Sequence, residues 1–390
     1  MELSKKIQAM ELSPYADAAR AAGKKVYGLN IGQPDIKTPR AFFDAVKNFD
    51  QDVLAYANSQ GIPELLEALV GYYKRLGLDF EKKDLLVTTG GSEAISMLMT
   101  ALLDDDDEVI MAEPFYTNYK TFIAAAGGKL VGIPTTAEEG YQYAVKEKIE
   151  AVITPKTKAI CIINPGNPTG KVLTHDEMKL IVDIAIAHDL FIIADEVYRE
   201  FVYDGKRMDT FGSFPEAAQH VIIVDSISKR FSACGARMGS IASKNEALMG
   251  NLMKICQARL CCATLDQIGA AALYNMDPSY FNDIKAEYEH RRNVAVEALN
   301  EIEGIQYGVP EGAFYITCKL PVDDAEKFLM FLLTEFDVNG ETCMFAPAGG
   351  FFTNPEAGKS DMRIAYVLKA EDMKAGINII KEGIKAYNAR

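Results

Sequence analysis

Short, continuous runs of apolar residues recur through the first two-thirds of the chain, separated by longer segments whose apolar residues have a helical spacing. Such runs are typical of strands that are buried on both faces of a parallel sheet. Strands are predicted at residues 84–88, 108–111, 129–133, 159–163, 190–194, 221–224 and 240–242. Helices are predicted at residues 63–76, 94–103, 178–188, 246–257 and 264–274. This alternation predicts an α/β fold with a mostly parallel sheet.

The last third of the chain mixes short strands with helices, which are predicted at residues 280–299, 325–335 and 370–387. One of the strands, residues 361–366, carries a single arginine and has the pattern of an edge strand. A length of 390 residues favours two domains. We expect an N-terminal arm at residues 1–14, a large domain at residues 45–289, and a smaller α+β domain formed by residues 15–44 and 290–390. The smaller domain would begin with a helix at residues 15–23 and a strand at residues 26–31.

The charge balance argues against some classes of partner. The net charge is −14, so neither nucleic acid nor an anionic membrane surface is expected as a partner. No apolar run is long enough for a signal peptide or a membrane span. Seven cysteines without a CxxC pair favour free thiols in a reducing cytoplasm, and the four histidines have no metal-ligand spacing. The four aspartates at residues 104–107 favour a solvated turn over a metal site.

Four polar segments directly follow predicted strands, at residues 90–92, 164–170, 195–198 and 226–229. They supply a glycine turn before a helix, an amide presented by two Asn-Pro turns, a carboxylate and a lysine. Ligands of open parallel sheets bind outside the carboxyl ends of the strands, so we expect these groups to meet at one edge of the sheet. A glycine turn at a helix N-terminus also binds anions, because its backbone N–H groups are free.

The lysine, Lys229, is predicted to lie on a loop after the strand at residues 221–224. Ser226 and Ser228 precede it, and Arg237 follows eight residues later. Hydroxyl donors and a fixed cation can converge on one dianion beside a reactive amine, as a bound phosphate ester would require. The alternative is a solvated loop with a surface lysine and an ion-paired arginine.

This lysine segment resembles the lysine motif of class I pyridoxal-phosphate aminotransferases, and the string NPGNPTG at residues 164–170 matches the same family. The resemblance extends from Gly32 to Arg363 and implies the fold type I architecture, with a mostly parallel seven-stranded sheet flanked by helices in the large domain. It implies pyridoxal 5'-phosphate as the cofactor, bound to Lys229 as a Schiff base. Asp195 would pair with the protonated ring nitrogen and Tyr198 would bond the ring oxygen, which makes these three the expected catalytic residues.

The resemblance also assigns the other residues of the site. Those expected to bind the cofactor with Lys229, Asp195 and Tyr198 are Gly91, Ser92, Tyr116, Asn167, Ser226, Ser228, Arg237 and Tyr56. Those expected to bind the substrate are Gly32, Asn167 and Arg363, the last through the α-carboxylate. Tyr56 would reach the cofactor phosphate of a neighbouring subunit, which implies a homodimer. Without the resemblance, Tyr56 and Tyr116 would be interpreted as packing residues. Asp195 would be interpreted as a helix cap or part of a surface turn, and Arg363 as part of a surface ion pair.

The implied reaction moves an amino group between an L-amino acid, with aspartate favoured, and a 2-oxo acid such as 2-oxoglutarate. A C–S β-lyase could use the same residues. A non-catalytic regulatory module is a third reading, but the lysine is retained and there is no room for a DNA-binding domain before Gly32. Aspartate specificity stays open, because Gln257 stands where aspartate-specific relatives have a second arginine, and Arg259 lies two residues further on.

Overall fold

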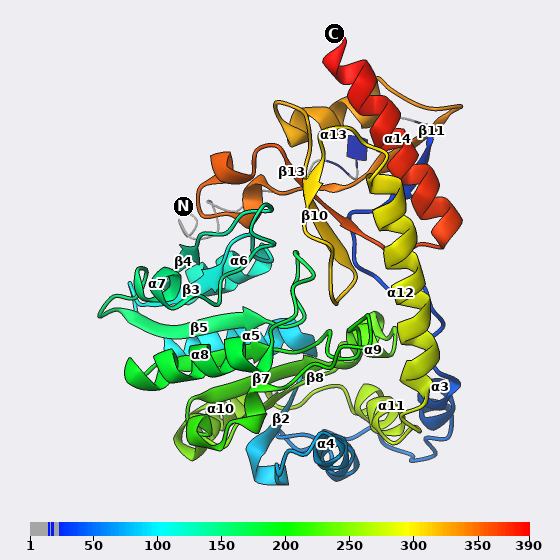
Figure 1. Cartoon of the computed structure of the whole chain (residues 1–390). Helices are drawn as coiled ribbons and strands as arrows, with labels where there is room; N and C mark the ends of the chain where they lie inside the picture. Colours follow the sequence, from blue (N-terminus) through cyan, green and yellow to red (C-terminus); the bar gives the residue numbers. More distant parts are fainter. Residues whose placement is uncertain (1–14, 16, 19–22) are drawn as a thin grey trace, which may run out of the picture.

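The computed structural model describes residues 15, 17–18 and 23–390. The predicted arm at residues 1–14 and most of the predicted helix at residues 15–23 lie outside the described residues. The chain forms a large sheet with helices on both faces, and a second group of strands and helices built mainly from the C-terminal part (Figure 1). No helix in the described part of the chain is both long enough and apolar enough to cross a membrane.

The large sheet has seven strands in the order β2-β8-β7-β6-β5-β3-β4. β8 runs antiparallel to both of its neighbours, β2 and β7, and the other adjacent pairs of strands are parallel. The strands are β2 (Leu85–Thr88), β3 (Glu108–Ala112), β4 (Lys129–Ile133), β5 (Thr157–Ile163), β6 (Phe191–Asp195), β7 (Val221–Ser226) and β8 (Gly239–Ala242). The prediction of a mostly parallel seven-stranded sheet is therefore confirmed.

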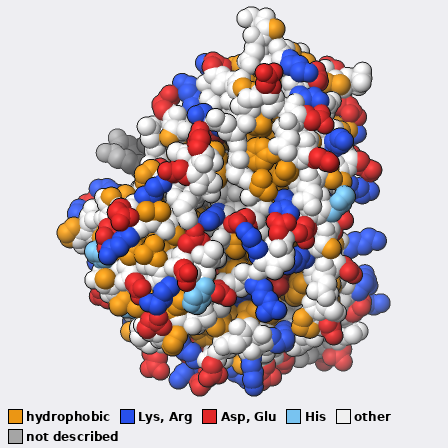
Figure 2. Space-filling model, in the orientation of Figure 1, with side chains coloured by type: hydrophobic (Ala, Val, Ile, Leu, Met, Phe, Trp, Pro, Cys, Tyr) orange, Lys and Arg blue, Asp and Glu red, His pale blue; other side chains and the backbone are white. Residues whose placement is uncertain are grey.

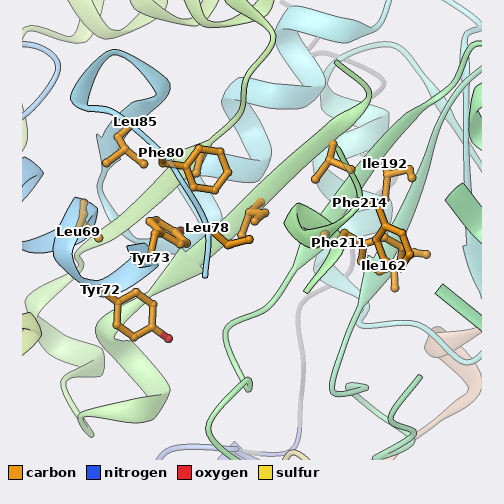
Figure 3. Packing of buried hydrophobic residues seen from close by; sticks show 14 of the residues in the cluster. Leu69, Tyr72, Tyr73, Leu78, Phe80, Leu85, Ile162, Ile192, Phe211 and Phe214 are labelled. Carbon is orange, nitrogen blue, oxygen red and sulfur yellow. The ribbon is translucent and has the colours of Figure 1, made fainter. Parts of the chain in front are cut away.

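Two apolar clusters cover the two faces of this sheet, because successive strand residues point to opposite sides. On β6, Ile192 and Ala194 belong to one cluster and Ile193 to the other. The first cluster packs against α4 (Pro63–Arg75), α8 (His175–Ala187) and α11 (Thr264–Tyr274), and Figure 3 shows part of it. The second packs against α5 (Gly90–Leu102), α6 (Asn118–Ala125) and α10 (Glu246–Arg259). The remaining helices of this part are α3 (Arg40–Lys47), α7 (Lys146–Glu150) and α9 (Ile227–Arg230).

The C-terminal part contains a four-stranded antiparallel sheet in the order β12-β13-β10-β9. Its strands are β9 (Gln306–Tyr307), β10 (Tyr315–Lys319), β12 (Ala346–Pro347) and β13 (Asp361–Ala365). A parallel pair, β1 (Lys25–Gly28) with β11 (Glu341–Met344), joins residues from near the two ends of the described chain. The helices are α12 (Tyr280–Leu299), which extends from the large sheet towards this part in Figure 1, α13 (Ala325–Thr334) and α14 (Ala370–Asn388). A third apolar cluster forms the core here.

Three local predictions are wrong. The strand at residues 361–366 is not an edge strand, because the two-residue strand β12 covers its outer side and all of β13 is buried. Lys229 is not on a loop: β7 continues through Ser226, and Lys229 lies in the one-turn helix α9. The strand was expected to end before Asp225, but the buried Arg230 side chain pairs with this carboxylate. Finally, α5 begins at Gly90 rather than at residue 94.

Candidate active site

A cavity of about 430 Å³ lies at the carboxyl ends of the parallel strands. It is lined by every residue predicted for the site except Tyr56, namely Gly32, Gly91, Ser92, Tyr116, Asn167, Asp195, Tyr198, Ser226, Ser228, Lys229, Arg237 and Arg363. The structure therefore brings together residues that are more than 300 positions apart in the sequence. Their individual roles stay predictions.

Lys229 reaches into this cavity from α9, where Ser226 caps the helix by accepting a hydrogen bond from the Ser228 N–H. Lys229 Nζ donates a hydrogen bond to the carbonyl oxygen of Gly32 over 2.9 Å. Among the described residues, the hydrogen-bond partner of Lys229 Nζ is this backbone carbonyl and not a carboxylate.

Asp195 is the last residue of β6, and two donors hold its carboxylate. The Tyr119 hydroxyl donates to Oδ2 over 2.7 Å, and the Val197 N–H donates to Oδ1 over 3.3 Å. Loss of hydration nevertheless raises the pKa of Asp195 to about 6, with these bonds and the Lys229 charge acting in the opposite direction. A cationic group in the cavity would favour the ionised carboxylate, as a protonated pyridine nitrogen does.

The start of α5 is a candidate site for an anion. The first N–H groups of a helix have no partners within the helix, and Gly91 and Ser92 lie in this first turn. Gly90 has φ of +75°, and a side chain there would collide with the Arg237 guanidinium. Glycine therefore lets Arg237 approach the helix start. Together with Ser226 and Ser228, these groups provide the hydroxyl, N–H and guanidinium donors that a phosphate dianion requires.

The other end of the cavity is built around Arg363 from β13. Its Nη1 donates to Asn167 Oδ1 over 3.0 Å and its Nη2 donates to the carbonyl oxygen of Asn30 over 2.7 Å. Its buried Nε has no hydrogen-bond partner within the described chain. Asn167 in turn donates through Nδ2 to the Tyr198 hydroxyl over 3.4 Å. A guanidinium held in this way is suited to a carboxylate.

The predicted residue Tyr56, and the two residues considered for aspartate specificity, lie elsewhere. Tyr56 is 82% exposed and does not line the cavity of its own chain. Arg259 pairs with Glu93 over 3.0 Å and donates to Cys262 Sγ over 2.6 Å, so its guanidinium is occupied away from the cavity lining. Gln257 does not line the cavity either.

Among the lining residues that were not predicted, Asn30, Tyr119 and Tyr315 each contact a predicted site residue. Asn30 acts through a backbone carbonyl, which has no signature in the sequence. Tyr119 lies in the first turn of α6, beyond the loop that follows β3, and Tyr315 lies on β10 of the smaller sheet. The local string of Tyr119, an aromatic-rich turn after β3, is the only signal that could have drawn attention to it.

Comparison with known proteins places this geometry among enzymes of one family. The family model "Aminotransferase class I and II" matches residues 24–380. An aspartate aminotransferase of Bacillus subtilis is 28% identical over 406 residues, covering 100% of both chains. Aromatic-amino-acid aminotransferase 2 of Thermococcus litoralis is 30% identical over 367 residues, covering 92% of each. The solved structure of an alanine aminotransferase of Pyrococcus furiosus superimposes with a TM-score of 0.90 at 29% identity, covering 99% of this chain and 100% of that one.

Proposed function

Because this chain belongs to the family of class I and II aminotransferases, we propose that it transfers the amino group of aspartate to a 2-oxo acid such as 2-oxoglutarate. Like the other members of its family, the chain is a transaminase that depends on pyridoxal phosphate. The names of its relatives differ in the amino acid, so the preference for aspartate is the part that needs a test. The observation that carries the proposal is the single cavity that holds Lys229, the Asp195 carboxylate, the anion site and Arg363.

The residues present fit the cofactor. The start of α5, with Ser226, Ser228 and Arg237, would hold the phosphate. Asp195 would pair with the protonated ring nitrogen, a cationic partner that favours its ionised carboxylate. Asn167 and Tyr198 would bond the ring oxygen. When bound, pyridoxal phosphate supplies an electron sink that weakens the Cα–H bond of the amino acid.

The protein residues then have distinct tasks. Arg363 binds the α-carboxylate of the amino acid and so fixes the position of its Cα. Lys229 Nζ takes up the proton from this Cα, a general-base step that is worth on the order of 10²–10⁴ in rate. Asp195 remains ionised beside its cationic partner. The Tyr198 hydroxyl donates a hydrogen bond into the cavity and remains neutral, since burial raises its pKa.

We further propose a homodimer. Val53, Leu54, Tyr56 and Leu260 are each more than 50% exposed. Two segments that carry them are tied together, because Thr264 Oγ1 donates to the carbonyl oxygen of Ala55 over 3.2 Å. An exposed apolar surface of this kind is suited to a partner subunit. The exposed Tyr56 would then complete the cavity of that partner.

We also propose a cytoplasmic location. All seven cysteines are free, which supports this proposal.

Complementation between inactive variants tests the dimer. Lys229→Ala and Tyr56→Phe proteins are mixed, unfolded and refolded together. A mixed dimer has one cavity with both changes and one with neither, so activity rises well above that of either variant alone. No gain over the separately refolded variants would contradict a shared site, and size measurement of the wild type gives an independent check.

The substrate preference is tested by the rate of keto-acid formation from aspartate, alanine and phenylalanine with 2-oxoglutarate. We expect the highest kcat/KM for aspartate. A higher value for either other donor would overturn the aspartate proposal and leave the transaminase assignment intact. Release of pyruvate and a thiol from cystathionine, without consumption of 2-oxoglutarate, would instead favour the β-lyase.

A further inference from the structure

Tyr315 lies in the cavity between the groups expected to bind the substrate and those expected to bind the cofactor. It is the first residue of β10, which pairs with β13 so that Tyr315 is opposite Ala365 and Thr317 is opposite Arg363. Tyr315 and Arg363 are therefore diagonal neighbours on one face of the sheet, within reach of long side chains. The Arg363 guanidinium carbon is 4.6 Å from the centre of the Tyr315 ring, a cation–π distance.

The hydroxyl of the same side chain reaches the other group. Its oxygen lies 3.0 Å from the Tyr198 hydroxyl oxygen, and the two rings meet edge to face with centroids 5.6 Å apart. If Tyr198 is to donate into the cavity, it must accept the proton of Tyr315 in this bond. An accepted hydrogen bond makes a hydroxyl a stronger donor, so Tyr315 would strengthen the bond that Tyr198 makes to a ligand.

Tyr315 also explains the glycine at position 32. A Cβ at this position would collide with the Tyr315 hydroxyl. The carbonyl oxygen of Gly32 accepts the hydrogen bond from Lys229 Nζ. Tyr315 is only 3% exposed, so its ring cannot move aside without disturbing its neighbours.

We propose that Tyr315 is a positioning residue of the transamination site, in which the ring orients Arg363 and the hydroxyl orients Tyr198. The proposal rests on the proposed function, since it assigns a ligand to each of these two residues. Arg363 has only two hydrogen bonds, to Asn167 and to the Asn30 carbonyl, and its Nε is unpaired within the described chain. The ring of Tyr315 therefore contributes to fixing the plane of the guanidinium.

The ring and the hydroxyl can be removed separately. Tyr315→Phe removes the hydroxyl alone, whereas Tyr315→Leu removes both. A matched control is Tyr141→Phe, because the Tyr141 hydroxyl is also buried and also bonds β10, at the Thr317 carbonyl, but lies outside this cavity. Two quantities are measured for each loaded protein: the dissociation constant of maleate, a dicarboxylate without an amino group, and the pH midpoint of the visible absorption change.

Loss of the Tyr315 hydroxyl should change the pH midpoint of the absorption change and should not affect carboxylate binding. In Tyr315→Phe we expect the midpoint to rise by about 0.3–1 pH unit. Without Tyr315, the Tyr198 hydroxyl is a weaker donor and leaves more negative charge on the cofactor oxygen. The nitrogen that joins Lys229 to the cofactor then keeps its proton to a higher pH. The maleate constant should change by less than about twofold. In Tyr315→Leu we expect maleate to bind about two- to thirtyfold more weakly as well. Tyr141→Phe should match the wild type in both quantities.

An unchanged midpoint in Tyr315→Phe would overturn the role of the hydroxyl, and wild-type maleate affinity in Tyr315→Leu would overturn that of the ring. If Tyr315→Leu does not fold, Phe351→Leu tests the ring support independently, since Phe351 lies 5.2 Å from the same guanidinium and comes from a different segment. Its maleate affinity should fall without a change in the midpoint, and wild-type affinity would count against ring support. Failure of the proposed function is distinguishable, because the wild type would then release no keto acid from any donor.

Discussion

Arg230 directly follows Lys229 in the sequence, and its buried side chain interacts with two carboxylates and an aromatic ring. It is 1% exposed and pairs with Asp225 on β7, whose side chain is fully inaccessible to solvent. Its Nη1 lies 3.6 Å from the carboxylate of Glu200, and its guanidinium lies 4.7 Å from the Tyr72 ring. The second carboxylate oxygen of Asp225 has no hydrogen-bond partner in the described chain. Asp225 is therefore compensated largely by Arg230, with Arg199 as a second nearby cation.

Arg230→Met removes this charge and keeps a side chain of similar length. Breaking a buried ion pair on one side costs about 3–5 kcal/mol, because the remaining charge stays buried. For a domain of about 150–250 residues, 1 kcal/mol corresponds to roughly 2–4 °C in Tm. We therefore expect the Tm of the variant to fall by about 6–20 °C. The loss should grow with pH. Burial raises the pKa of Asp225 even in the wild type, and a raised carboxyl pKa means that the folded state loses stability as the group ionises.

Thermal unfolding of the cofactor-free variants between pH 5 and pH 8 measures this effect. Arg390→Met is a suitable control, since Arg390 pairs with Glu335 on the surface and its loss should change Tm by less than about 3 °C. The double variant Asp225→Asn/Arg230→Met should recover much of the lost stability, because no buried charge remains unpaired. A single variant within about 2 °C of the wild type, or a double variant no more stable than the single, would refute the reasoning.

Three other changes test the site. Arg363→Lys keeps the charge but loses the two-pronged geometry, so KM for the amino acid should rise about tenfold or more while cofactor absorption is unchanged; an unchanged KM would contradict its role. The pKa of Asp195 is raised to about 6, so its ionisation lowers the stability of the cofactor-free protein as pH rises from about 4 to above 6; Asp195→Asn should lack this decline, and equal pH profiles of unfolding would contradict it. Gly32→Ala places a Cβ against the Tyr315 hydroxyl and should lower kcat/KM at least about tenfold, whereas Gly235→Ala, with open space around the added atom, should not; equal values would contradict the collision.

The strands of the large sheet were predictable because each is apolar on both faces. The prediction failed where a buried charge continues a strand, as Asp225 does, since its partner Arg230 is recognised only in three dimensions. It also failed at β13, where a strand of two residues decides whether the neighbour is an edge. Figure 2 shows acidic and basic side chains interspersed over the visible face.

The site was predictable to the extent that its residues follow strands of one sheet. This rule places Asp195, Asn167 and Lys229 together without knowledge of the fold. It could not identify Tyr315, which reaches the cavity through the register of β10 with β13. The exposed Tyr56 does not line the cavity of its own chain, so its expected contact with a partner subunit stays a proposal.

The most direct test of the central claim is the visible absorption spectrum of the protein loaded with pyridoxal phosphate, recorded before and after addition of aspartate without a keto acid. We predict a band that depends on Lys229, its conversion to the spectrum of the aminated cofactor, and release of one oxaloacetate per cofactor converted. Lys229→Ala should show neither the wild-type band nor the conversion on the same timescale. A wild-type spectrum that no amino acid changes, or a Lys229→Ala protein that behaves as the wild type, would contradict the assignment of Lys229 as the reactive lysine of a transaminase.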